Sequence, residues 1–598
     1  MVTQILPNYT GSIQPCSYAG FAPLDPQNKS ALFYWYFPHQ SSTPDSQVPL
    51  LVWFQGGPGS SSMFGMFLEN GPFTMEATKD GGYKLNYVDE NGGQSWAYYY
   101  NVLFLDQPVD VGFSYTSDNS YPTNEDQVAS QVWTALQYFV NLHPETKNLK
   151  WYYTGESYAG RYVPANAYWT LKFNDQINAK TLNGTLINLK GVLIGDGLYH
   201  GVNQRITEVY AAAAASLIAP YQWPQAMAFF VNCQIQAAKN DSRTLDTCNA
   251  IPGYIRDISG IDVYAINLPG NVTDNLLPGL EFYLNNPAVI SALHVTGSKK
   301  TGQKFVESSQ NAYNALAGEI MFNHSLSFLN SILTRIPCLL FEGNFDAKDG
   351  SLSAYKLFPL LGQPYSNILN VSRNIWYIQG IPQGFWSIYQ NLTHVIFDSA
   401  GHFVPYFNLP ASVKMIEIFT MNNNNWDPYR NTTPINQIMC NYMNNCSGNG
   451  QCNSLGVCAC KQGFGLADCS AKATPIATTT YTLQPRDYLF ASVQFTANLD
   501  QILQFTGDGG LLEIHYTGTK NGPIADSEEA DFSIFAVPGW TKARTIYLNA
   551  SPNGYGYLTI HNTDYWKPVT FTVRKLGLPN SEAPHEKSFL GKEVVVDI

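Results

Sequence analysis

The feature that most constrains the fold is the run from Gly155 to Gly160, which reads Gly-Glu-Ser-Tyr-Ala-Gly and is close to the form G-x-S-x-G. In that motif a serine lies on a sharp turn between a strand and a helix, and its hydroxyl is presented above the edge of a sheet. Residues 149–154 form an aromatic, strand-like run, and residues 162–173 continue with helical spacing. The sequence therefore predicts a strand, a tight turn at Ser157 and a helix.

Segments typical of strands and helices alternate on both sides of this run. A helix is expected to begin at Thr123 in a capping box with Asp126, because apolar residues then recur at helical spacing. The expected strands are 31–37, 49–54, 101–106, 189–194, 337–342 and 394–397. This alternation predicts an α/β fold with a doubly wound, mostly parallel sheet in a first domain, residues 1–436.

Residues 203–330 interrupt the alternation with alanine-rich and amide-rich helical segments. We expect them to form a helical cap insertion rather than more sheet, with a disulfide between Cys233 and Cys248. The α/β pattern then resumes, and the Asn-rich residues 421–425 predict a linker.

Six of the ten cysteines lie between residues 440 and 469. A glycine-rich segment this short cannot bury a useful core, so cross-links are expected to hold it together. Zinc binding is the alternative, and the C-x-C spacing and a secreted context disfavour it. The last three cysteines and the glycine spacing resemble an EGF-like module over residues 437–472. That resemblance implies three disulfides: Cys440–Cys452, Cys446–Cys458 and Cys460–Cys469.

The chain after the last cysteine is rich in Thr, Tyr, Val and Phe at period-two spacing. Turn residues at 508–510 and 553–554 separate these runs. This pattern predicts a β-sandwich-like domain over residues 473–578. Residues 579–598 are expected to form a polar tail.

The net charge and the cysteine content of the chain limit its possible binding partners and its cellular location. The net charge is −12 and the pI is about 5.3, which argues against a nucleic-acid partner. No apolar run is long enough for a membrane span, and no signal peptide is visible at the first residue. The cysteines predict a secreted, extracellular or lysosome-like compartment. Eleven N-x-S/T sequons give modest further support: Asn8, Asn28, Asn183, Asn240, Asn271, Asn323, Asn370, Asn391, Asn431, Asn445 and Asn549.

A serine hydroxyl becomes a useful nucleophile only beside a base that is itself oriented by a carboxylate. Two downstream residues have suitable settings. Asp346 lies in a loop after the strand-like run 337–342, and His402 lies just after the run 394–397. Because catalytic groups converge at the carboxyl ends of parallel strands, Ser157, Asp346 and His402 form the predicted catalytic set.

Four blocks in this chain resemble the serine carboxypeptidase family of α/β-hydrolases. Residues 55–62 read Gln-Gly-Gly-Pro-Gly-Ser-Ser-Ser, and residues 106–115 begin Asp-Gln-Pro and end Gly-Phe-Ser-Tyr. Residues 155–164 run from Gly-Glu-Ser-Tyr-Ala-Gly to Val-Pro, and residues 401–405 read Gly-His-Phe-Val-Pro. The resemblance implies an α/β-hydrolase fold and an enzyme that needs no metal or cofactor.

The same resemblance implies roles for individual positions. Ser157 would be the nucleophile, His402 the base and Asp346 its orienting carboxylate. The backbone N–H groups of Gly57 and Tyr158 would form an oxyanion hole. The C-terminal carboxylate of the substrate would be recognised by three residues: Gln55, Glu69 and Glu156.

The chain departs from the family pattern at two informative positions. Gln55 stands where the family has asparagine, and its extra methylene is expected to alter or weaken carboxylate recognition. Ser60 stands where the family has a bridged cysteine, so Cys16 and Cys338 are left over and are expected to pair with each other. Two acidic residues beside a bound carboxylate cannot all be ionised, which predicts better peptidase activity at acidic pH.

The predicted function is a serine carboxypeptidase that releases C-terminal residues from peptides through an acyl-enzyme. An acyltransferase that uses the same triad is one alternative. A structural or adhesive extracellular protein on a hydrolase-like scaffold is another, because EGF-like and β-rich domains commonly bind partners. Expected partners are peptide substrates, a protein or glycan ligand for the C-terminal domains, and a second copy of the chain.

Overall fold

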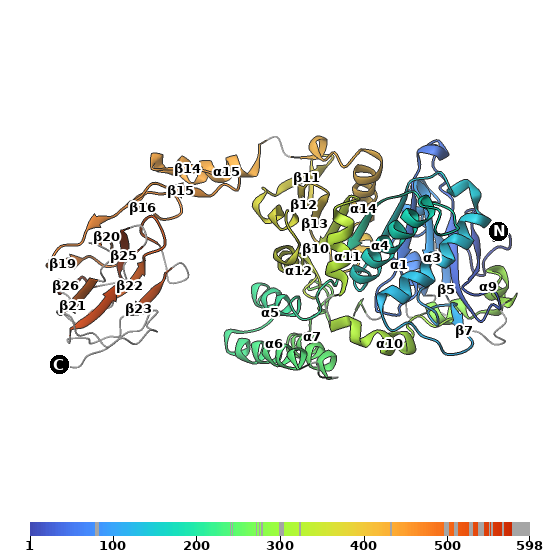
Figure 1. Cartoon of the computed structure of the whole chain (residues 1–598), viewed down its shortest axis with the longest axis horizontal. Helices are drawn as coiled ribbons and strands as arrows, with labels where there is room; N and C mark the ends of the chain where they lie inside the picture. The colour runs from blue at the N-terminus through green and yellow to red at the C-terminus, as the bar shows by residue number, and fades with distance from the viewer. Residues whose placement is uncertain are drawn as a thin grey trace. The chain divides into compact units, whose positions relative to one another are not determined.

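The computed structural model describes residues 1–77, 83–239, 241, 243–270, 272–273, 276, 279–297, 304–321, 324–430, 433–495, 501–507, 512–524, 530–535, 543–548, 551, 554–564 and 567–576. The chain divides into two compact units, residues 1–431 and 432–598 (Figure 1). Several predicted features lie outside the described residues: the turns at 508–510 and at Asn553, the tail 579–598, and the sequons at Asn240, Asn271, Asn323, Asn431 and Asn549.

An eleven-stranded mixed sheet forms the centre of the first unit. Its strand order is β1-β2-β6-β3-β8-β9-β10-β13-β12-β11, with β7 paired to β2. The strands from β6 to β13 run parallel, and antiparallel pairs close both edges. Their bounds are β1 Tyr18–Pro23, β2 Ser30–Phe37, β3 Leu50–Phe54, β6 Asn101–Leu105, β7 Tyr115–Thr116, β8 Trp151–Glu156, β9 Leu189–Gly195, β10 Cys338–Gly343, β11 Asn374–Ile378, β12 Ile381–Tyr389 and β13 Leu392–Phe397. This sheet confirms the predicted fold class.

Both faces of the sheet are covered, which explains why its central strands are apolar throughout. In β3, Leu50, Val52 and Phe54 pack into the core on one face, and Leu51 and Trp53 pack into the core on the other. Helices on the first face are α3 Glu125–Leu142, α4 Ala159–Asn178, α11 His324–Leu333 and α12 Ser351–Leu357. Helices on the second face are α1 Ser62–Leu68, α2 Trp96–Tyr99, α9 Pro287–Ala292, α13 Val404–Phe407 and α14 Leu409–Ile416.

Helix α3 begins one residue later than the predicted capping box requires. Its N-cap is Asn124, whose side chain accepts a hydrogen bond from the N–H of Gln127. The N–H of Thr123 donates instead to the side-chain oxygen of Gln127. Thr123 therefore lies just before the cap, and the predicted start is wrong by one residue.

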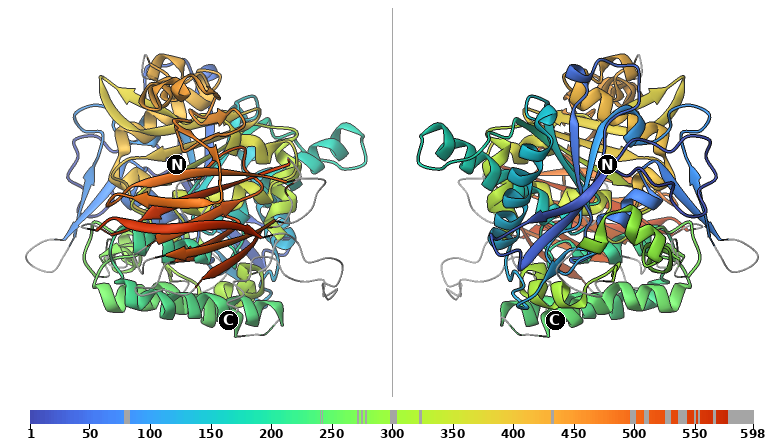
Figure 2. Two further views of the ribbon diagram at one scale, coloured as in Figure 1. Left: turned by 90° about the vertical axis from the view of Figure 1, so that its left-hand side faces the viewer. Right: turned by 90° about the vertical axis from the view of Figure 1, so that its right-hand side faces the viewer.

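The insertion contains a small core of its own, separate from those of the sheet. It is built from α5 Arg205–Ala214, α6 Trp223–Ala238 and α7 Thr244–Ser259, which lie together at one end of the first unit (Figures 1 and 2). The predicted disulfide Cys233–Cys248 is confirmed and joins α6 to α7. Helices α8 Leu280–Leu284 and α10 Gln310–Met321 follow. Helix α11 crosses the predicted boundary at residue 330 and packs against α4.

The predicted disulfide between Cys16 and Cys338 is wrong, because both cysteines are free. Cys16 precedes β1, whereas Cys338 begins β10 and is buried in the middle of the sheet. Six strand spacings of ~4.8 Å separate β1 from β10 in the strand order, or roughly 25–30 Å. A disulfide needs Cα atoms within about 7 Å.

The two thiols should therefore differ in reactivity. Cys16 is exposed, whereas Cys338 is buried and burial raises the pKa of its thiol. We expect a thiol reagent to modify one cysteine in the native protein and a second only after unfolding without reductant. Replacing Cys16 with serine should remove the native reaction. Absence of both thiols in the unfolded, unreduced chain would show that the two cysteines pair after all.

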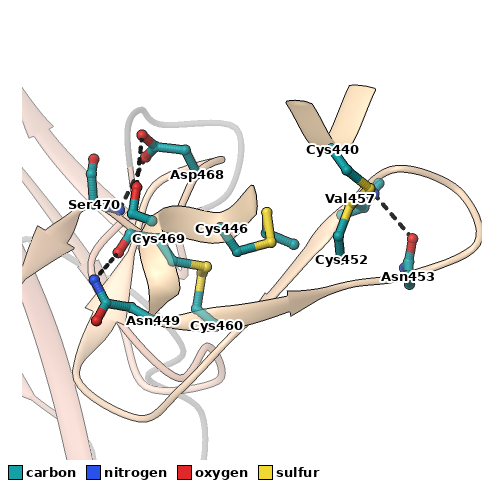
Figure 3. The surroundings of a disulfide bond; sticks show 12 residues. Cys440, Cys446, Asn449, Cys452, Asn453, Val457, Cys460, Asp468, Cys469 and Ser470 are labelled. Atoms are coloured by element: carbon teal, nitrogen blue, oxygen red, sulfur yellow. Dashed lines mark hydrogen bonds between the residues drawn. A yellow bond between two sulfur atoms is a disulfide. The ribbon is translucent and has the colours of Figure 1, made fainter. Parts of the chain in front are cut away.

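Three disulfides hold the first part of the second unit (Figure 3). They join Cys440 to Cys452, Cys446 to Cys458 and Cys460 to Cys469, so the predicted pairings are confirmed. The segment contains little regular structure besides α15 Ile435–Tyr442 and two short strand pairs. These strands are β14 Gly450–Cys452, β15 Cys458–Cys460, β16 Phe464–Gly465 and β17 Ala471–Lys472.

Two sheets enclose one apolar core in the rest of the second unit. The five-stranded sheet has the order β18-β20-β25-β22-β23 and the four-stranded sheet β19-β26-β21-β24. Their bounds are β18 Thr474–Pro475, β19 Thr479–Leu483, β20 Tyr488–Gln494, β21 Gln501–Gly507, β22 Leu512–Thr517, β23 Phe532–Phe535, β24 Arg544–Leu548, β25 Tyr555–Asn562 and β26 Val569–Leu576. This is the predicted β-sandwich.

The disulfide-held segment is joined to the sandwich by backbone hydrogen bonds. The N–H of Gly463 donates to the carbonyl of Asn521, and the N–H of Leu466 donates to that of Pro523. A Cβ on Gly465 would lie 1.8 Å from the carbonyl oxygen of Pro523, so only glycine fits at this contact.

The predicted linker at residues 421–425 is wrong. Trp426 is buried, and its ring lies edge-on to Trp376 and parallel to Trp386. These contacts extend the first unit past residue 425, to Asn431. A run of asparagines is typical of a turn, and here it turns the chain back onto the sheet rather than away from it.

No helix in the described ranges is long and apolar enough to cross a bilayer. Among the sequons in these ranges, Asn8, Asn183, Asn370 and Asn445 are exposed. Asn28 is half-buried, and so is Asn391, whose side-chain amide donates to the carbonyl of Leu333.

Candidate active site

Ser157 lies on the turn between β8 and α4, as the motif predicts. Its φ of 61° is in the left-handed region, which is uncommon for a residue with a side chain. Glycines allow the chain to pack closely around this turn. A Cβ on Gly155 would lie 2.4 Å from the carbonyl oxygen of Phe54, and one on Gly56 would lie 2.8 Å from the Cβ of Ser157. A backbone hydrogen bond stabilises this strained conformation, since the carbonyl of Ser157 accepts from the N–H of Leu198.

His402 and Asp346 are brought together from two loops at the carboxyl end of the sheet. Asp346 follows β10 and His402 follows the neighbouring parallel strand β13, while Ser157 follows β8 in the same sheet. The Nδ1 of His402 lies 2.6 Å from Oδ2 of Asp346, and both side chains are buried.

The Asp346 carboxylate is itself fixed by backbone donors. Its Oδ1 accepts from the N–H of Lys348 at 2.7 Å and from that of Asp349 at 3.2 Å. The insertion holds the other partner: the N–H of His402 donates to the carbonyl of Tyr264, and the two rings meet edge-on at 4.8 Å. The pair therefore has a fixed geometry that turns Nε2 of His402 away from the carboxylate.

Gly57 and Tyr158, the two predicted oxyanion-hole residues, line the same cavity as Ser157. Tyr158 is the N-cap of α4, a helix of 20 residues, so the partial positive charge of this helix end lies at the turn. The loop that contains Gly57 packs closely on this turn. A Cβ on the neighbouring Gly56 would lie 2.7 Å from the amide nitrogen of Tyr158, so the approach requires a glycine.

The three residues expected to recognise a carboxylate are buried beside one another. The Nε2 of Gln55 donates to Oε1 of Glu156 at 2.7 Å, and the indole N–H of Trp53 donates to Oε1 of Gln55 at 2.9 Å. Both ends of the Gln55 amide are therefore held in place. The carboxyl of Glu69 lies next to that of Glu156, and the two can share a hydrogen bond only when one is protonated.

This environment favours the neutral form of both acids. Burial raises the pKa of Glu69 to about 7, although the contacts with Glu156, His402 and Gln55 partly oppose this shift. Burial also raises the pKa of Glu156, and the nearby charge of Glu69 raises it further. At least one protonated carboxyl is therefore available as a hydrogen-bond donor at neutral to acidic pH.

Asp196 is a buried carboxyl near the His402–Asp346 pair that motif comparison did not identify. It follows β9, and one of its carboxylate oxygens lies within 4.8 Å of a carboxylate oxygen of Asp346 and of a ring nitrogen of His402. Its Oδ1 accepts from the N–H of Gly343, while Oδ2 is buried without a hydrogen-bond partner in the described structure. Burial and the nearby charge of Asp346 raise the pKa of Asp196, which favours the neutral form of Asp196.

The cluster of Asp196, Asp346 and His402 has metal-ligating residue types within reach of one another. Nδ1 of His402 is already hydrogen-bonded to Asp346, which is the contact expected of a carboxylate that orients an imidazole base.

A cavity of about 310 Å³ opens beside Ser157 between the sheet and the insertion. The side chains around it come from elements far apart in sequence. No sequence motif marks the charged residues among them. Its lining residues are Gly57, Ser157, Tyr158, Leu198, Arg205, Leu245, Asn249, Pro252, Gly253, Arg256, Val263, Tyr264, Tyr313, Ile320, Lys348 and Asp349.

Comparison with known proteins gives a consistent result. A family model described as serine carboxypeptidase matches residues 7–422. "Venom serine carboxypeptidase" from Apis mellifera is 30% identical over 433 residues, which cover 68% of this chain and 84% of that protein. "Serine carboxypeptidase-like 50" from Arabidopsis thaliana is 31% identical over 418 residues, which cover 67% and 86%.

One solved structure supports the fold independently. The crystal structure of Kex1(delta)p, a prohormone-processing carboxypeptidase from Saccharomyces cerevisiae, superposes with a TM-score of 0.59 at 24% identity and covers 69% of this chain and 92% of that one. Together with the family match over most of the first unit, the sequence relationships are decisive: this chain belongs to the serine carboxypeptidase family.

Proposed function

We propose that this protein removes C-terminal residues from peptides through an acyl-enzyme on Ser157. His402 takes the hydroxyl proton as Ser157 attacks the last peptide carbonyl, and it returns this proton to the leaving amine as the C–N bond breaks. A water molecule, deprotonated by His402, then cleaves the ester and frees Ser157. Asp346 holds the imidazole and stabilises its charged form, and the N–H groups of Gly57 and Tyr158 bind the oxyanion.

The observation that carries this proposal is the pair of buried carboxyls beside the nucleophile. Glu156 directly precedes Ser157, and its partner Glu69 has a pKa raised to about 7. A protonated carboxyl can donate to a substrate carboxylate, and the second hydrogen of the Gln55 amide is a further donor. A group that recognises a free carboxylate next to the scissile bond limits cleavage to the end of a peptide.

Labelling with a fluorophosphonate, together with product analysis, tests the proposal. We expect one label per folded chain on Ser157, none on Ser157→Ala, and release of a free amino acid from a blocked dipeptide. A folded wild-type chain that stays unlabelled would favour the scaffold alternative. A labelled chain that transfers its acyl group to an alcohol, and not to water, would indicate an acyltransferase.

Peptidase activity should depend on pH through Glu69. Below pH about 7 this carboxyl is protonated and donates to the substrate, and above it the ionised form repels the substrate carboxylate. We expect kcat/KM for a blocked dipeptide to fall about tenfold per pH unit above this value.

A blocked amino-acid ester, which has no carboxylate, is the matched control because it needs the triad alone. Its kcat/KM should not fall in that range, and Glu69→Gln should flatten the peptide profile. A peptide profile that keeps rising through pH 8 would contradict this assignment.

We further propose a secreted or lysosome-like location and an EGF-like identity for residues 437–472. The four disulfides and the exposed sequons, such as Asn183 and Asn370, support this location. Recovery of oxidised, glycosylated protein from an extracellular or lysosomal fraction is the expected result. Recovery of the reduced protein from the cytosol would contradict it. A protein or glycan ligand for the second unit, or a second copy of the chain, remains a proposal of the same kind.

A further inference from the structure

The cavity beside Ser157 is lined by the nucleophile but not by the residues expected to bind the substrate carboxylate. It is lined by Ser157 and by the residue that follows it, Tyr158, whereas Gln55, Glu69 and Glu156 do not line it. If the released residue places its carboxylate at Glu69 and Glu156, the acyl part of the peptide must extend the other way. The cavity is then the space for the side chain that precedes the scissile bond. This step rests on the proposed function.

Three cations from separate elements line this cavity: Arg205 on α5, Arg256 on α7 and Lys348 in the loop after Asp346. Lys348 donates to the hydroxyl of Tyr264, and its Nζ lies 4.3 Å from the centre of that ring. Arg205 is buried, and its Nε has no hydrogen-bond partner in the described structure. Arg256 is partly exposed and lies 3.7 Å from Asp257, a weak ion pair at the surface.

Fewer negative groups face these cations. Asp349 lines the cavity, and one of its oxygens, Oδ1, is buried without a hydrogen-bond partner in the described structure. Glu208 lies behind Arg205, whose Nη1 donates to it at 2.5 Å. The remaining polar groups are Asn249, which accepts from Arg205, and the hydroxyls of Tyr264 and Tyr313. Among the described lining residues three cations thus accompany one carboxyl, Asp349, while Glu208 and Asp257 pair with Arg205 and Arg256 from outside the lining.

We propose that this cavity selects an acidic side chain, Glu or Asp, at the residue before the scissile bond. Lys348 and Arg256 offer charge-assisted hydrogen bonds to its carboxylate, and Arg205 adds favourable charge from the buried end. The volume of about 310 Å³ has room for such a side chain and water.

The preference should strengthen as the pH falls from 7 towards 5. Burial raises the pKa of Glu208 to about 7 and also raises the pKa of Asp349, against the opposing charges of Arg205 and Lys348. Glu208 therefore becomes neutral as the pH falls below about 7 and no longer compensates the charge of Arg205. The side chain of a substrate glutamate, with an ordinary pKa near 4.3, stays ionised there.

Blocked dipeptides of the form acyl-X-Leu test the proposal, with X as Glu, Gln, Lys or Ala. Gln has the shape of Glu without its charge, so the Glu/Gln ratio of kcat/KM isolates the charge preference. We expect a ratio of about tenfold or more at pH 5.5, lower at pH 7.5, and the poorest turnover for Lys. The double variant Arg256→Gln/Lys348→Gln should bring the ratio close to one.

Lys356→Gln is the control for loss of a positive charge outside the cavity, because Lys356 lies on α12, does not line the cavity and is exposed. Its ratio should equal that of the wild type. A wild-type ratio near one, with good turnover of the Ala and Gln substrates, would overturn this inference and leave the carboxypeptidase proposal intact. Absence of turnover for all four blocked dipeptides would contradict the proposed carboxypeptidase function instead.

Gly253 tests which side chain the cavity receives. A Cβ at this position meets no atom within 4 Å, so a larger residue would enter the cavity. We expect Gly253→Leu to lower kcat/KM for acyl-Phe-Leu much more than for acyl-Ala-Leu, with Gly253→Ala as the control. If the variant instead discriminates between acyl-Ala-Phe and acyl-Ala-Ala, the cavity receives the released residue and the inference is wrong.

Discussion

Replacement of Ser157 with alanine is expected to lower kcat for a blocked dipeptide by about 10⁵- to 10⁶-fold. Alanine offers no nucleophile, and only binding and the oxyanion hole remain to accelerate attack by water. The variant should fold normally, because Ser157 is already held at a φ of 61° and alanine meets the same strain without a new contact. Its melting temperature should therefore stay close to that of the wild type.

A binding measurement on the Ser157→Ala variant distinguishes loss of the nucleophile from loss of the substrate-binding site. Since Gln55, Glu69 and Glu156 are unchanged, the inactive protein should still bind a peptide with a free carboxylate and discriminate against its amide. A folded variant that retains more than about one-thousandth of the wild-type kcat would mean that another residue is the nucleophile.

Replacement of Asp346 with asparagine should lower kcat by about 10⁴-fold. Oδ2 of Asp346 lies 2.6 Å from Nδ1 of His402, where it accepts a hydrogen bond from the ring N–H. An asparagine can present its NH₂ group there, which makes Nδ1 an acceptor and moves the ring proton to Nε2. The imidazole then cannot take the proton of Ser157. KM should change little, because Asp346 is not among the residues expected to bind the substrate carboxylate.

Asp398→Asn is the matched control for this substitution. Asp398 follows β13, is exposed, and accepts from Asn344 at 2.9 Å. Its change should leave kcat within about twofold. Full activity of Asp346→Asn would mean that a different carboxyl orients His402, and buried Asp196 is the nearest alternative.

The sequence predicted the parts of this molecule that local patterns specify. Apolar runs gave the strands of the sheet, and the turn around Ser157 carried its own signal because its glycines are sterically required. Catalytic groups converge at the carboxyl ends of parallel strands, so the loops after β10 and β13 could be expected to lie at the same edge of the sheet as Ser157. The disulfide Cys233–Cys248 was also predicted correctly, and so were the three pairings that the resemblance to an EGF-like module implied.

Features that depend on distant packing were not predicted. The separation of Cys16 from Cys338 is set by the order of seven strands, which two isolated cysteines do not encode. Residues 421–425 were predicted as a linker from their asparagines, and Trp376 and Trp386, which pack on the adjacent Trp426, lie far from it in sequence. Asp196 follows an ordinary buried strand, β9, and no motif marks it. Only the folded sheet places it near Asp346, which follows β10, and His402, which follows β13.

The backbone contacts at Gly463 and Leu466 bear on how this protein could be shortened or recombined. A cut at residue 473, where composition changes, would remove the hydrogen-bond donors of the Asn521 and Pro523 carbonyls and the close contact of Gly465 with Pro523. A cut near residue 432 leaves this junction whole. The disulfide-held segment and the sandwich should therefore be treated as one transferable unit. A fusion of the sandwich to another enzyme should include the disulfide-held segment.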